Sequence, residues 1–250
     1  MLPEIIQEHW VIFLITGFII GLDKGGLKPL VGIGIFLITS VLDSRTMLAV
    51  LAPVMFIGEI FPTVHYQKDC AVKTLRRFIP WVIIGLIIGA TVGSGMSEQI
   101  FGISISIIVL SMGILLTRLE YRPFNIHPTH QFSIRIILGI IAGFGSIIGN
   151  MAGGVTNTYY LMHIKDKNTF LGTNARMYLS INGIKLIIYI FFWQVLTPQT
   201  LLITASLIPT IILGIITATL LVKVIPEKVY RYIILASIYY AGIAMLIRYV

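Results

Sequence analysis

Charged residues are scarce in this chain. Asp, Glu, Lys and Arg make up 11% of its 250 residues, 57% are hydrophobic, and the mean hydropathy is +0.95. Soluble globular domains carry roughly 25% charged residues, so this composition excludes a soluble globular domain. Four windows contain no charged residue at all. Each is long enough for a helix to cross a bilayer, which takes ~20 residues. They are 78–97, 99–117, 136–164 and 186–222.

Cysteine is almost absent. Cys70 is the only one, which excludes an intramolecular disulfide and a thiolate-rich metal site. The five histidines are scattered near segment ends without ligand spacing, so we expect no metal and no cofactor. The apolar segments show no nucleophile–base set, and we therefore expect that the protein is not an enzyme.

The charges that are present are mostly basic. The net charge is +8, but the basic residues fall in short loops between apolar runs, where orientation signals belong, so we expect no nucleic-acid partner. The amino terminus has Glu4 and Glu8 but no basic residue before its apolar run, which is not typical of a cleaved secretory signal. We expect a multi-pass protein of the inner (plasma) membrane. Its apolar runs are too long for the ~10-residue strands of a barrel, so its spans should be helices.

The chain resembles itself over a period of about 125 residues. "GFIIG" (17–21) resembles "GIIAG" (139–143), and "IPWVIIG" (79–85) matches "IPTIILG" (208–214). We therefore predict two membrane repeats, 1–125 and 126–250. Each would contain one broken apolar segment and three ordinary spans, which we place at 46–66, 78–96 and 98–117 in the first repeat and at 169–192, 199–222 and 229–247 in the second.

The loop charges indicate how the broken segments lie. If both return to their own side of the membrane as hairpins, 12 basic residues face the cytoplasm and 2 face outward; if both cross, the split is 8 to 6. The positive-inside rule favours the returning hairpins. Three crossings per repeat then insert the second repeat upside down. The predicted fold class is an all-α inverted repeat, each half a broken re-entrant helical hairpin plus three transmembrane helices, an architecture typical of secondary transporters.

The first break is the charged stretch "DKGGLK" between two apolar pieces, 10–22 and 29–42. A 13-residue helix rises about 20 Å, which brings its end near the bilayer midplane. Two helix amino termini that meet there would form a positive, donor-rich site for an anion. The candidate residues are Lys24, Gly25, Gly26 and Lys28 at the first break and Asn150, Gly153, Gly154 and Asn157 at the second. Asp23 would either neutralise Lys24 or relay protons.

A polar helix face in 169–192 supplies further candidates. Asn174, Tyr178, Asn182 and Lys185 fall within about 80° of one another at 100° per residue. We select Asn182 and Lys185 as substrate-binding candidates. Arg176 lies on nearly the opposite face, and we expect it to form an ion pair with Glu59, with a role in ion coupling as the alternative.

These features together resemble the sulfite exporter TauE/SafE family. The resemblance rests on a glycine-rich break in each half, the repeat length and the short basic loops, and it covers essentially the whole chain. The first break keeps Gly25, Gly26 and Pro29 but adds charges; the second keeps Gly149, Gly153 and Gly154, with Thr156 and Asn157 where a proline is expected. The resemblance implies a transporter of sulfite, sulfonates or related organosulfur anions.

The expected activity is export of such an anion, bound at midplane between the two breaks. An interior-negative potential drives each negative charge outward with about 2.3 kcal/mol per 100 mV, so export needs no coupling ion. The alternatives are a permease or channel for another small anion such as a carboxylate, and proton-coupled uptake through Asp23 or Glu59. The expected partners are the small anion and the lipid bilayer, and homo-oligomerisation stays open.

Overall fold

The protein is helical throughout the part that the structure describes. A computed structural model describes residues 7–25, 27, 30–121, 131–150, 152–221 and 227–250. The described residues are 86% helical, which confirms the prediction of an all-α protein. The helices are α2 (Trp10–Lys24), α3 (Val31–Thr39), α4 (Ser44–His65), α5 (Val72–Ser94), α6 (Glu98–Tyr121), α7 (Gln131–Gly149), α8 (Gly153–His163), α9 (Lys167–Ile187), the π-helical turn η2 (Ile188–Phe192), α10 (Pro198–Leu221) and α11 (Glu227–Tyr249).

Among the described residues, five helical segments are long and apolar enough to cross a membrane. They are Ser44–His65, Val72–Ser94, Phe132–Gly149, Asn168–Phe192 and Pro198–Leu221. This confirms a multi-pass membrane protein. One difference from the prediction is α7, the first helix of the second broken segment. Its 19 residues make it longer than α2 with 15, so α7 is long enough to span while α2 is not.

Two compact units divide the chain. Unit 1 comprises Met1–Val54, Ser97–Gly113 and Val195–Val250; unit 2 comprises Met55–Met96 and Ile114–Gln194. Each unit draws helices from both sequence halves. The compact units are therefore not the repeats 1–125 and 126–250, which stay a prediction about the sequence.

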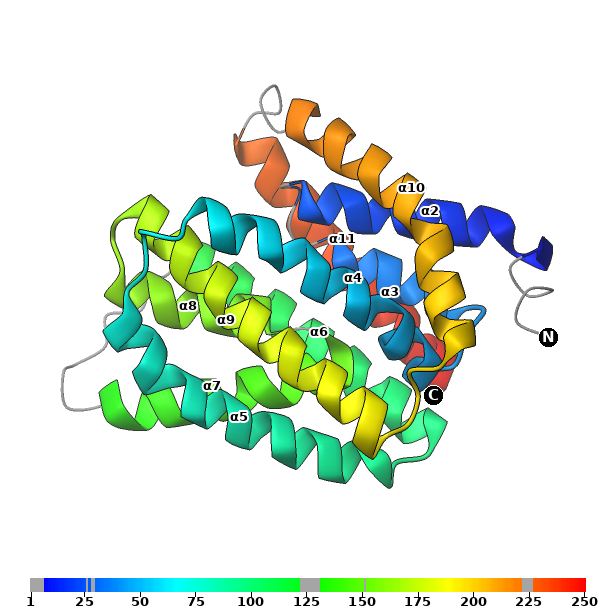
Figure 1. Ribbon diagram of the computed structural model, residues 1–250, viewed down its shortest axis with the longest axis horizontal. Coiled ribbons are helices and arrows are strands. Elements are labelled where there is room, and N and C mark those ends of the chain that lie inside the picture. The colour runs from blue at the N-terminus through cyan, green and yellow to red at the C-terminus, as the bar shows by residue number, and fades with distance from the viewer. Residues whose placement is uncertain (1–6, 26, 28–29, 122–130, 151, 222–226) are drawn as a thin grey trace. The chain divides into compact units, whose positions relative to one another are not determined.

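In unit 1 the first broken segment folds back on itself. The space beside Gly34 of α3 is filled by Ile20 of α2, because a Cβ at Gly34 would lie 3.1 Å from the Ile20 Cγ1. Helix α10 runs beside α2 (Figure 1). The two cross closely at Gly21, where a Cβ would overlap the carbonyl oxygen of Ile211. The hairpin itself is a feature of the chain, and its re-entry into a bilayer stays a prediction.

Unit 2 contains the corresponding crossing between α7 and α5. A Cβ at Gly143 of α7 would overlap the carbonyl oxygen of Val82 in α5. Gly143 matches Gly21 in the predicted repeat, and Val82 matches Ile211. The same close crossing therefore occurs once in each unit, each time between helices from opposite halves. This correspondence supports the repeat.

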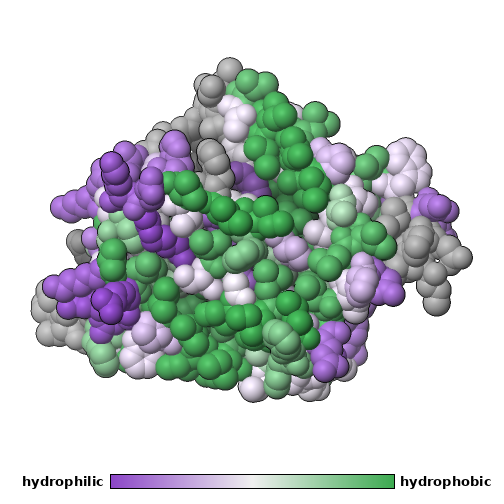
Figure 2. Space-filling view, in the orientation of Figure 1, coloured by the Kyte–Doolittle hydropathy of each residue, from purple (hydrophilic) through white to green (hydrophobic). Residues whose placement is uncertain are grey.

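Polar side chains gather at one end of unit 2. Figure 2 shows hydrophilic surface where α4 joins α5 and where α8 joins α9, and apolar surface along the helices. The exposed polar residues there include Gln67, Lys68, Lys73, Arg77 and Lys165. These basic residues belong to the loops that the charge distribution predicts to be cytoplasmic.

Candidate functional site

Asp23 holds the first break together. Its Oδ1 accepts a hydrogen bond from the backbone N–H of Val31, at 3.2 Å, and the side chain is 6% exposed. The first N–H groups of a helix lack intrahelical partners and carry partial positive charge, so a carboxylate there stabilises the start of α3. Asp23 therefore has a structural role that the sequence left open.

Gly25 does not present a free donor at this break. Its N–H donates to the carbonyl of Gly21 at 2.8 Å, and a Cβ at Gly25 would lie 2.6 Å from both the Cβ of Ala218 and the carbonyl oxygen of Ile215. Gly25 is thus needed for the close approach of α10, instead of exposing its N–H as the sequence suggested. The other candidates of this break, Gly26 and Lys28, lie outside the described residues.

The second break is formed by Asn150 at the end of α7. Its φ of 56° is left-handed, a conformation that Asn tolerates better than most residues and that commonly ends a helix. Its N–H donates to the carbonyl of Ser146 at 3.1 Å. Helix α8 then begins at Gly153, and the preceding Ala152 supplies no side-chain cap. The first N–H groups of α8 are therefore left without a capping side chain from that residue.

Lys185 of α9 reaches this break. It is 1% exposed, and its Nζ donates to the Oδ1 of Asn150. Since an ammonium group only donates, the amide oxygen must face the lysine and the Nδ2 must point elsewhere. That Nδ2 is buried and has no hydrogen-bond partner among the residues described. The structure thus brings together Lys185 and Asn150, which the sequence proposed separately.

Hydroxyl groups line the first turns of α8. Thr156 and Tyr178 share a hydrogen bond, and a Cβ at Gly153 would lie 3.7 Å from the Tyr178 hydroxyl. Tyr160 lies one turn further along α8, is fully buried and interacts electrostatically with Tyr178. Its hydroxyl has no partner within the described part of the chain. Thr156 and Tyr160 were not among the candidates, although their spacing of four residues places them on one helix face.

Three other asparagines lie in α8 and α9. The Nδ2 of Asn182 donates to the carbonyl of Met55 at 3.2 Å, so Asn182 links α9 to α4. Asn157 follows Thr156 directly and therefore projects about 100° away from it around α8. Asn174 is 7% exposed, and its Oδ1 is a buried acceptor with no partner among the described residues.

Arg176 caps the end of α4. Its guanidinium donates to the backbone carbonyls of Tyr66 at 3.1 Å and of Gly172 at 3.0 Å, and also to that of Gln67. The carbonyls at a helix carboxyl end lack intrahelical donors, and an arginine has enough N–H groups to satisfy several. The predicted ion pair with Glu59 stays a prediction. Glu59 lies on α4 and is 7% exposed.

The comparison with known proteins identifies the family. A family model described as "Sulfite exporter TauE/SafE" matches residues 10–245. The chain belongs to the TauE/SafE family. The match includes both breaks and Lys185, and it confirms the predicted family and the transporter class. Neither the curated proteins nor the solved structures that were searched contain a match to this chain.

The polar groups at the second break of this TauE/SafE protein are chiefly donors. They comprise the Lys185 ammonium, the Asn150 Nδ2 and the amino terminus of α8. A helix amino terminus and a buried cation both favour negative charge. The arrangement fits an oxyanion better than a cation or a neutral ligand.

Proposed function

We propose that this protein exports small sulfur-containing oxyanions and that Lys185, Asn150 and the first turn of α8 bind them. The observation that carries the proposal is the buried Lys185 ammonium. It donates to the Oδ1 of Asn150, whose side-chain Nδ2 has no protein partner among the described residues. Leaving a buried donor unsatisfied costs about 1–3 kcal/mol, and a bound anion would remove that cost.

The depth of Lys185 supports a transport role. Asn168–Phe192 is the apolar stretch of α9 and η2, and Lys185 lies seven residues before its end, or about 10 Å along the helix. A lysine side chain is shorter than that, and this one points into the protein, so it does not reach the interface. Ionisable residues inside a membrane are costly and commonly mark a substrate pathway.

The number of donors favours a sulfur oxyanion. Sulfite and sulfonate groups each present three oxygens on one centre, whereas a carboxylate presents two. The Lys185 ammonium, the Asn150 Nδ2 and the first N–H groups of α8 supply several donors. Hydrogen bonds from a charged donor to the oxygens of an anion are stronger than those between neutral groups. The role of Lys24 and Lys28 stays a prediction from the sequence, and the donors of unit 2 carry the proposal by themselves.

Proton-coupled uptake is the second candidate because of Glu59. A carboxylate that is 7% exposed within a predicted span is a plausible proton carrier. Asp23 is a poorer one, because its Oδ1 already accepts the Val31 N–H at the start of α3. Export needs no such carrier, since the membrane potential alone drives an anion outward.

The test is a flux panel in proteoliposomes. Labelled sulfite, methanesulfonate, sulfate and acetate are compared for the wild type, Lys185→Met and Lys165→Gln. Lys165 is an exposed loop lysine and serves as the matched control for loss of one positive charge. We expect sulfite and sulfonate to move faster than acetate, and Lys185→Met alone to abolish the difference. Equal rates for all four anions, or unchanged rates in Lys185→Met, would refute the proposed site.

A further inference from the structure

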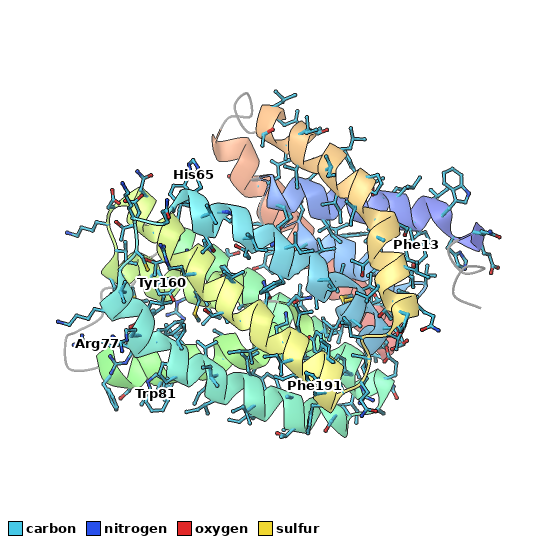
Figure 3. The ribbon with its side chains drawn as sticks, in the orientation of Figure 1. Phe13, His65, Arg77, Trp81, Tyr160 and Phe191 are labelled. Atoms are coloured by element: carbon cyan, nitrogen blue, oxygen red, sulfur yellow. The ribbon has the colours of Figure 1, made fainter. Side chains whose placement is uncertain are left out.

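Two arginines stand at one level on neighbouring helices of unit 2. Helices α5 and α7 run parallel, because the positions that touch advance together: Gly139 lies against Trp81, and Gly143 lies against Gly85. Both pairs differ by 58 residues. Arg135 and Arg77 also differ by 58, and each lies about one turn before the first of these contacts. In Figure 3 Arg77 is near one end of α5, with Trp81 one turn further along.

Tyr159 of α8 joins the two arginines. The Tyr159 hydroxyl lies close enough to the Arg135 and Arg77 side chains to interact with both electrostatically. Tyr159 is 2% exposed, and its ring stacks on Phe78 with centroids 4.0 Å apart and planes 8° from parallel. Because this stacking fixes the ring, the hydroxyl has a defined position beside the two cations.

No carboxylate balances these charges within the described part of the chain. The Nε of Arg135 is buried and has no hydrogen-bond partner there. The remaining contact of the Arg135 guanidinium is with the Phe132 ring, 5.0 Å from its centroid. Two like charges at one level repel each other, and a buried guanidinium N–H without an acceptor is costly. An anion between the arginines would relieve both.

We propose that Arg77, Arg135 and the Tyr159 hydroxyl form a second oxyanion-binding site, at the end of unit 2 that the charge distribution predicts to be cytoplasmic. Arginine suits this ligand because its planar fork matches the oxygens of sulfur and phosphorus oxyanions. Six residues of α8, about 9 Å, separate Tyr159 from Gly153 at the second break. Thr156 places a hydroxyl within that distance. The role in transport rests on the proposed function, with this site receiving the anion before it reaches Lys185.

The ligand chemistry has two sources. A dissolved sulfur oxyanion and the phosphate of an anionic lipid head group present similar oxygens, and basic clusters at cytoplasmic helix ends bind both. Purified protein is therefore titrated calorimetrically with sulfite in neutral detergent. In a second arm, protein in the same detergent receives phosphatidylglycerol, and retained lipid is counted by native mass spectrometry.

Five variants separate this site from the first. Arg77→Gln and Arg135→Gln each remove one cation, Arg135→Lys keeps the charge but not the fork, and Tyr159→Phe removes the hydroxyl. Arg76→Gln is the matched control, since Arg76 is exposed on the same turn of α5 and does not interact with Tyr159. Monodispersity and the unfolding temperature show that each variant is folded. We expect the affinity for sulfite or lipid to fall about tenfold or more in Arg77→Gln and Arg135→Gln. Arg135→Lys and Tyr159→Phe should show an intermediate loss of affinity, and Arg76→Gln should show none.

The outcomes distinguish the two sites. Loss of one sulfite site in Arg135→Gln, with a second site that only Lys185→Met removes, supports both proposals. Loss of lipid but not sulfite in Arg135→Gln assigns the arginine site to a lipid phosphate. Loss of sulfite in Arg135→Gln while Lys185→Met binds normally supports this site and refutes the one at Lys185. Unchanged sulfite and lipid binding in folded Arg77→Gln and Arg135→Gln overturns the arginine site.

Discussion

Replacing Lys185 with Met separates a binding role from a structural one. Methionine has a similar length and volume but no charge, so it fills the same buried space between α9 and the end of α7. If the lysine binds an anion, the variant loses affinity without losing stability. If the lysine is there to hold the fold, the variant unfolds more easily.

The contacts give the expected size of both effects. Losing the donor leaves the Asn150 Oδ1 unsatisfied, at a cost of about 1–3 kcal/mol. Removing a 1% exposed ammonium relieves a desolvation penalty of several kcal/mol. Without anion the Met variant should therefore be at least as stable as the wild type. A hydrogen bond from a charged donor is worth about 1.5–3 kcal/mol, so its loss weakens anion binding about 10- to 150-fold.

A thermal unfolding assay in detergent, with and without sulfite, measures both. Sulfite at 100 times the wild-type Kd should stabilise the wild type by about 2.7 kcal/mol, and a variant with tenfold weaker binding by about 1.4 kcal/mol. The reasoning fails if Lys185→Met unfolds at a markedly lower temperature without anion, or if sulfite stabilises it as much as it stabilises the wild type.

Three further predictions concern the fold around the site. Asn150→Gly keeps the left-handed backbone but removes the acceptor of the buried Lys185 ammonium, so it should weaken anion binding and lower the unfolding temperature, and Asn150→Ala should lower that temperature further, because Ala adopts a φ of 56° with strain. Gly143→Ala should destabilise the protein by about 1–3 kcal/mol through its overlap with α5, whereas Gly95→Ala should not, because its Cβ would meet only one atom, at 3.9 Å. The Thr169 N–H at the start of α9 holds the pKa of Asp166 below its ordinary value of 3.8. The ionised Asp166 carboxylate therefore stabilises the protein above pH 3.8, and this stabilisation is lost as the pH falls through the lowered pKa. Asp166→Asn, which caps the helix without titrating, should remove this part of the pH dependence in thermal unfolding scans.

The sequence was informative where an apolar run is interrupted. Asp23, the adjacent lysine and the glycines stand inside such a run, and helix α2 ends there as predicted. The end of α7 was harder to locate, because no equivalent charged interruption separates its long apolar stretch from the second break. Helix length therefore followed from the structure and not from the charge pattern.

Side-chain reach explains what the helical-wheel argument could not show. Asn182 and Lys185 share a face of α9, but the long lysine extends to Asn150 while the short asparagine bonds the nearer carbonyl of Met55. The Arg176 guanidinium donates to backbone carbonyls at the end of α4, which the charge pattern of the sequence did not indicate. Tyr160 was missed because an aromatic residue in an apolar helix looks like core, and only the structure shows its hydroxyl buried without a partner among the described residues.

The most direct test of the central claim is the flux of labelled sulfite out of loaded proteoliposomes under an imposed potential, with no pH gradient. A divalent anion gains about 4.6 kcal/mol on leaving an interior that is negative by 100 mV. We predict that sulfite efflux rises with the imposed potential and that Lys185→Met abolishes the rise. Efflux that ignores the potential, follows a pH gradient instead and loses that dependence in Glu59→Gln would contradict the account and make Glu59 the coupling residue.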